Sequence, residues 1–199
     1  MNIREKIYRF FVKNGTGHED ADIAAYGFYN IVLFLSGIVV SVLVGIALNQ
    51  TKGVLLFLLF FIPLRSYAGG FHTKSLISCG IISTLIVIAV ALLMNTEAEL
   101  NSEATIILFA LMTGLLVYLS PQDCKSKILF ASEKRKYKII VISICFVYSL
   151  LTLVSIYYSQ NMVAEAVMLA MLVCSTSLLA AFVSNKICRN KKMNRIGEN

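Results

Sequence analysis

Long apolar stretches limit what this chain can fold into more than any other feature. Five of them approach the roughly 20 residues that a helix needs to cross the hydrocarbon core of a bilayer. They cover residues 26–48, 76–94, 104–119, 139–158 and 162–184. Apolar residues make up 58% of the 199 residues and charged residues 15%, whereas soluble domains have about half and about a quarter. The sequence therefore predicts an all-α, polytopic membrane protein.

A sixth apolar segment is shorter. Residues 53–64 give only 12 residues before Arg65, which is about 18 Å of helix. The helix must continue through Ser66 and Tyr67, or stop inside the protein beside a cavity that shields its backbone. Such a cavity would lie next to residues 65–75. In both cases we count six hydrophobic segments.

The first residues favour an interfacial helix over a cleaved signal peptide. Basic and apolar residues alternate between Ile3 and Lys13, and acidic residues follow before any long apolar run. We expect residues 3–13 to form an amphipathic helix in the membrane interface, within an interfacial segment 1–20. We treat residues 1–199 as a single membrane-embedded domain.

The basic residues predict the orientation. All 18 Lys and Arg residues except Lys52 fall in the N-terminal segment, the 65–75 turn, the 120–138 loop and the 185–199 tail. Short basic loops stay in the cytoplasm, so both termini and the basic tail are predicted to be cytoplasmic. Topology and attraction to anionic lipids explain the positive charge, and we predict no nucleic-acid partner.

Small residues recur every four positions in the first and last spans. They are Gly37, Ser41 and Gly45, and then Ala166, Ala170 and Cys174. This spacing lets helices approach closely. It fits packing within one subunit or the interface of a homodimer.

The polar residues that suggest chemistry lie between the short segment 53–64 and the start of the segment 76–94. They are Arg65, Gly69, Gly70, His72 and Cys79. Taken singly, each has an ordinary explanation, such as a snorkelling arginine or a cysteine that fills a small apolar space. Of the two histidines, only His72 lies within reach of a cysteine at the membrane boundary. On an unbroken helix the pair would sit about 10 Å apart along the axis, and a turn between them would close that gap.

Taken together, these residues predict a nucleophilic cysteine. Hydroxyl residues at 73, 75 and 78 are possible N-caps for the next helix. Cys79 would then lie near a helix N-terminus, where the helix dipole and a nearby imidazolium favour the thiolate. Gly69 and Gly70 leave room for backbone N–H groups beside a developing oxyanion. A Cys–His pair needs no metal.

The five cysteines show neither a disulfide framework nor a zinc motif. They stand at positions 79, 124, 145, 174 and 188, without CxxC spacing. His72 and Cys79 supply two ligands where structural zinc takes four. We predict no metal and no other cofactor.

The Arg-Ser-Tyr-Ala-Gly order from Arg65 and the His-x6-Cys spacing resemble the signature of the AgrB (accessory gene regulator protein B) family. The resemblance extends over nearly the whole chain, and the loop from Pro121 is a looser match. It implies a membrane cysteine endopeptidase of the bacterial cell membrane that cleaves a small AgrD-type propeptide of quorum sensing. Cys79 would be the nucleophile and His72 the general base, and Arg65 and Gly70 would support the site. A thioester on Cys79 would then be attacked from within the substrate, which closes a thiolactone or lactone ring.

Two other classes stay open from the residues alone. A small transporter or exporter would use Arg65 and His72 along a permeation path, and it would work without Cys79. A non-catalytic scaffold would dimerise through the small residues. The basic cluster Lys134, Arg135 and Lys136 is explained by the positive-inside bias, or it binds the acidic C-terminal segment that such substrates carry.

Overall fold

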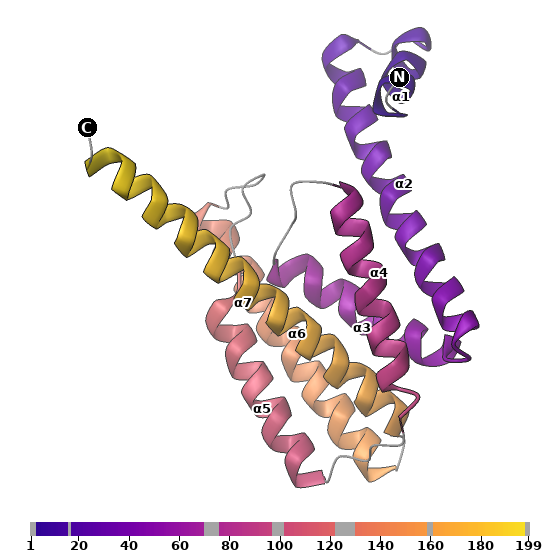
Figure 1. The fold of residues 1–199 in the computed structure, drawn as a ribbon, viewed down its shortest axis with the longest axis vertical. Coiled ribbons are helices and arrows are strands. Elements are labelled where there is room, and N and C mark those ends of the chain that lie inside the picture. The colour runs from indigo at the N-terminus through magenta and orange to yellow at the C-terminus, as the bar shows by residue number, and fades with distance from the viewer. Residues whose placement is uncertain are drawn as a thin grey trace. The chain divides into compact units, whose positions relative to one another are not determined.

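The computed structural model describes residues 3–15, 17–69, 76–96, 102–121, 130–158 and 161–197 (Figure 1). In these residues it contains seven α-helices and no strand. The chain divides into two compact parts, residues 1–43 and 44–199, which are described separately below. Whether residues 1–199 act as a single domain stays a prediction.

The first part holds α1 (Ile3–Lys13) and most of α2 (His18–Ala47). Gly15 between them has φ +87°, a conformation that glycine adopts at no steric cost. The ring of Phe11 on α1 meets Phe28 on α2 edge-on, with 6.5 Å between centroids. The helix at residues 3–13 is therefore present and packs partly on α2, and its position in the membrane interface stays a prediction.

The second part is built around α7 (Asn161–Gly197), which packs on three helices. Its partners are α3 (Thr51–Ala68), α5 (Ser102–Leu119) and α6 (Ala131–Tyr157). The fifth helix of this part, α4 (Leu76–Leu93), packs on α3. Ala166, Ala170 and Cys174 of α7 are fully buried. The predicted small-residue face of the last span therefore packs inside the subunit.

Within the described ranges, four helices are long and apolar enough to cross a membrane. They are α2, α3, and the stretches Ser132–Tyr157 of α6 and Asn161–Lys186 of α7. Two more apolar helices, Ser78–Leu93 and Glu103–Leu119, are shorter. The length and composition of the four helices support a membrane protein, and the count of six crossings stays a prediction. The short segment from residue 53 does not stop at Arg65, because α3 continues to Ala68.

Two predicted boundaries were wrong because charged residues form helix as readily as apolar ones. The loop predicted over 120–138 is shorter, since α6 begins at Ala131. Glu and Lys are good helix formers, and the Glu133 carboxylate accepts a hydrogen bond from the Phe130 N–H at 3.2 Å. For the same reason α7 does not end at 184, and the basic tail continues it to Gly197.

Gly45 is the position in α2 where the next helix comes closest. A Cβ built there would lie 3.1 Å from the Thr51 Cα and 3.2 Å from the Val54 Cβ, whereas Gly37 faces open space. We expect Gly45→Leu to lower the free energy of unfolding by about 1–3 kcal/mol through overpacking. Gly37→Leu on the same helix is the matched control and should be nearly neutral. Thermal unfolding in detergent measures both, and equal losses would contradict the close approach at Gly45.

Candidate active site

The C-terminal turn of α3 is closed by a reciprocal pair of hydrogen bonds. The half-buried Arg65 donates from Nη1 to the Gly69 carbonyl, and the Gly69 N–H donates to the Arg65 carbonyl at 3.3 Å. Arg65 therefore fixes the point from which the chain leaves α3.

Gly69 has a conformation that glycine alone adopts readily. Its φ is +78° and its ψ is −157°, in a region that is essentially closed to residues with a Cβ. Its N–H serves the helix end in this structure, so the glycine acts here as the residue that terminates α3. Gly70, the other glycine predicted to support an oxyanion, lies outside the described residues.

Cys79 lies in the first turn of α4 and is half-buried, with a free thiol. The other two cysteines whose side chains are described, Cys145 and Cys174, are buried with free thiols. A reactive cysteine has to be partly accessible, whereas a buried one behaves as a small apolar residue. Among the cysteines whose side chains are described, Cys79 is therefore the most accessible.

His72 lies outside the described residues, as do residues 70–75 of the stretch 65–75 beside which the cavity was predicted. The other histidine, His18, has a local partner in the first part of the chain. Its Nδ1 is 2.9 Å from the Tyr8 hydroxyl. Arg65 and Cys79 stand on either side of the connection that carries His72, at the end of α3 and the start of α4.

The basic cluster Lys134, Arg135 and Lys136 lies in the first two turns of α6, on a helix rather than on a loop. Arg135 and Lys136 are exposed. The next residue, Tyr137, meets the ring of Tyr67 on α3, with 5.9 Å between centroids. This contact brings the cluster next to the α3 turn of Arg65 and Gly69. Sequence reasoning missed Tyr137, because only the fold pairs it with a tyrosine of the motif.

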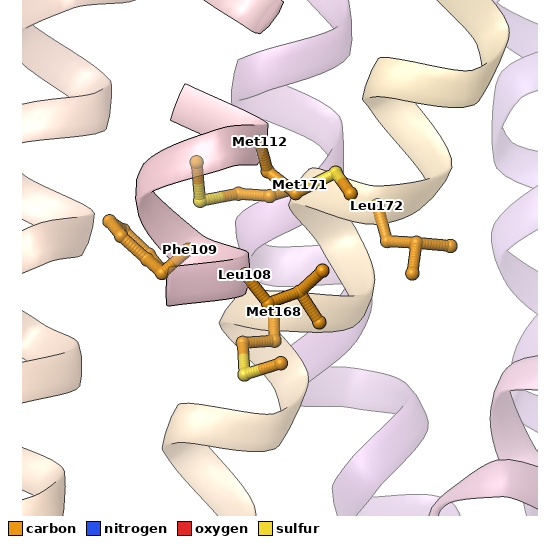
Figure 2. A pocket seen from close by; sticks show the side chains of 6 residues that line it. All are labelled: Leu108, Phe109, Met112, Met168, Met171 and Leu172. Carbon is orange, nitrogen blue, oxygen red and sulfur yellow. The ribbon is translucent and has the colours of Figure 1, made fainter. Parts of the chain in front are cut away.

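A pocket between α5 and α7 holds no catalytic group (Figure 2). Its empty space, open solvent included, is about 190 Å³, and it is lined by Leu108, Phe109, Met112, Met168, Met171 and Leu172. These side chains offer carbon and thioether sulfur, so they cannot transfer protons. Within the described part of the chain, no three His, Cys, Asp or Glu residues gather to hold a metal ion.

Comparison with known proteins indicates the same family as the motif around Arg65 and Cys79. The family model for accessory gene regulator B matches residues 4–179. AgrB-like protein 2 of Clostridium perfringens (strain 13 / Type A) is 26% identical over 165 residues, which are 78% of this chain and 77% of that protein. An AgrB-like protein of C. perfringens strain SM101 is 26% identical over 125 residues, 60% of this chain and 58% of that protein. No solved structure matches. The chain therefore belongs to the accessory gene regulator B family, and this membership implies a role in processing the peptide of agr quorum sensing.

Proposed function

We propose that this protein is a membrane-embedded cysteine endopeptidase that cleaves an AgrD-like propeptide and promotes cyclisation of the signal segment. The observation that carries the proposal is Cys79, an accessible free thiol in the first turn of a helix, in a chain whose family processes such peptides. The buried Cys145 and Cys174 offer no competing nucleophile among the described cysteines.

The reaction consists of two acyl transfers. His72 takes the proton of the Cys79 thiol, and Sγ attacks the scissile carbonyl carbon. The C–N bond breaks, His72 returns the proton to the leaving amine, and a thioester remains on Cys79. A thiol or hydroxyl of the substrate then attacks the thioester carbonyl, and the S–C bond breaks. The proton lost by this attacking group returns to Cys79. One peptide bond is exchanged for one ring bond, so the chemistry consumes neither ATP nor an oxidant.

Arg65 and the glycines position the base in this scheme. Arg65 holds the Gly69 carbonyl and Gly69 ends α3, so the chain leaves the helix at a fixed point before it reaches His72. Gly70 is the candidate donor to the developing oxyanion. Limited water at the membrane boundary would favour ring closure over hydrolysis. We place this site on the cytoplasmic side of the cell membrane, with both termini, because of the distribution of basic residues.

The proposal is tested by reconstitution. The protein is inserted into vesicles that contain anionic lipid and is given a synthetic AgrD-like propeptide, a chelator and no nucleotide. We expect a released C-terminal fragment and a cyclic product that is one water lighter than the linear N-terminal fragment, both detected by mass spectrometry. An intact propeptide after incubation with correctly inserted protein would contradict the proposal.

We also propose that the basic cluster captures the acidic C-terminal segment of the propeptide. Replacing Lys134, Arg135 and Lys136 with glutamine should lower kcat/KM for an acidic propeptide by roughly tenfold or more, because charge complementarity mainly speeds association. Added salt should slow the wild type in the same way. Initial rates at low substrate concentration measure both effects.

Two controls separate capture from topology. Replacing Arg189, Lys191 and Lys192 with glutamine removes the same charge from the tail and should leave kcat/KM nearly unchanged. A propeptide with a neutralised C-terminal segment should be cleaved equally by the wild type and the α6 variant. The α6 variant could insert normally and show the same ratio of cleavage rates for the acidic and neutralised propeptides as the wild type. In that case the cluster acts only as a topology signal.

A further inference from the structure

Helix α3 has a weak point just before the residues that end it. Pro63 lies inside the helix, two residues before Arg65. Proline has no backbone N–H, so the Leu59 carbonyl loses its hydrogen-bond donor, and the proline ring crowds the preceding turn. Inside a membrane, backbone groups released in this way need partners from neighbouring helices. The turn from Leu59 to Pro63 therefore requires support from outside α3.

Tyr148 of α6 makes a hydrogen bond to this turn, at the carbonyl that follows the one of Leu59. Its hydroxyl donates to the Phe60 carbonyl at 2.6 Å, across 88 positions of sequence. The Tyr148 and Phe60 rings also meet edge-on, with 5.3 Å between centroids, and both residues are buried at 6% and 8% exposure. The phenolic oxygen thus reaches the α3 backbone within the turn that Pro63 disturbs.

The link acts on the segment that carries the proposed chemistry. Arg65 comes five positions after Phe60, which is about 7.5 Å along a helix. Arg65 in turn holds the Gly69 carbonyl, and the connection with His72 begins there. Without the link, the last turns of α3 would be held by side-chain packing alone, through residues such as the fully buried Leu64 and Ala68.

We propose that Tyr148 is a positioning residue for the acyl-transfer reaction. Its hydrogen bond fixes the C-terminal end of α3, where Arg65 and Gly69 lie and from which the sequence leads to His72 and Cys79. This inference rests on the proposed function. Tyr148 does not touch the reacting atoms, so its loss changes the rate of acylation and leaves substrate capture at the α6 cluster intact.

The first test is Tyr148→Phe, which removes one oxygen atom and keeps the ring packing. A cross-helix hydrogen bond in a membrane is weak, so we expect kcat for propeptide cleavage to fall roughly three- to fifteenfold. KM should stay within about twofold of the wild-type value, because Tyr148 does not touch the substrate and substrate binding is unaffected. Tyr157→Phe is the matched control on the same helix, because Tyr157 is exposed, and it should retain the wild-type kcat.

A second variant separates positioning from general stability. Pro63→Ala restores a donor for the Leu59 carbonyl and relieves the crowding of the turn, so α3 then depends less on Tyr148. We expect the kcat loss from Tyr148→Phe to shrink in the Pro63→Ala background. A purely structural role in the α3–α6 packing would give the same loss in both backgrounds, and that result would overturn the inference.

The link can also be measured without catalysis. In a Cys79→Ala background, amide hydrogen exchange over residues 59–69 should be faster in Tyr148→Phe and unchanged in Tyr157→Phe. Equal exchange, or an unchanged kcat in Tyr148→Phe, would overturn the inference. Failure of the proposed function is distinguishable, since cleavage by Cys79→Ala would contradict that function while the exchange measurement still decides whether the link holds α3.

Discussion

Replacing Cys79 with alanine should abolish propeptide cleavage, with a loss of at least about a thousandfold, because the proposed reaction forms its thioester on this thiol. Cys79→Ser should be nearly as inactive, since a serine hydroxyl in place of the thiol needs far stronger activation. The measurement is the yield of the C-terminal fragment from protein inserted in vesicles, with the amount of inserted protein matched between variants.

The other cysteines provide the controls for this experiment. Cys145 and Cys174 are buried in the helix bundle, so replacing either with alanine should change stability more than activity. Cys124 and Cys188 should tolerate replacement by serine. A Cys79→Ala variant that cleaves at the wild-type rate would remove the peptidase proposal and leave the transporter and scaffold alternatives.

Replacing Arg65 with glutamine should cause the next largest loss. The guanidinium donates to the Gly69 carbonyl, and a hydrogen bond from a charged group contributes about 1.5–3 kcal/mol. We therefore expect kcat to fall about ten- to hundredfold. The kcat of Arg65→Lys should lie between those of the wild type and Arg65→Gln. A lysine ammonium keeps the charge and can donate to one carbonyl, but it lacks the planar geometry of arginine. Single-turnover cleavage rates measure both variants.

The same variants decide between two roles for Arg65. If Arg65 holds the end of α3, as its bond to Gly69 indicates, the loss should be equal for acidic and neutralised propeptides and should appear in kcat. If Arg65 instead binds a substrate carboxylate, the loss should appear in KM and disappear with the neutralised propeptide. The second pattern would contradict the positioning role.

The sequence predicted which segments would be helical better than it predicted where they end. Apolar runs located the cores of α2 to α7, because a bilayer requires long apolar helices. They placed the start of α6 at 139, where the charges stop, although the helix begins at Ala131. Hydropathy reports where a helix can meet lipid, whereas helix propensity and the bond from Phe130 to Glu133 decide where it begins.

Contacts between distant helices could not be predicted from this sequence. A membrane helix that is apolar on all sides carries no stripe that shows which face meets a neighbour. The links from Tyr148 to Phe60 and from Tyr137 to Tyr67 therefore came from the fold alone. Small residues gave a partial signal. Ala166, Ala170 and Cys174 are buried as expected, whereas Gly37 of the similar pattern in α2 is exposed. A homodimer through α2 stays a prediction.

The motif residues could be predicted individually, and part of their arrangement is now described. Arg65 and Gly69 are joined by hydrogen bonds, and Cys79 lies in the first turn of α4. The spacing from His72 to Cys79 predicts a turn that brings the pair together, and this step of the mechanism stays a proposal. A measurement of the reaction itself tests whether His72 and Cys79 act together.

The most direct measurement is capture of the acyl-enzyme. A propeptide whose ring-closing thiol or hydroxyl side chain is replaced by alanine cannot cyclise, so the thioester should accumulate. Intact-protein mass spectrometry should then show the protein plus the N-terminal fragment, on the peptide that contains Cys79, and hydroxylamine should release the fragment. Rapid cleavage of this propeptide with no adduct, or with an adduct on another residue, would contradict the thioester on Cys79.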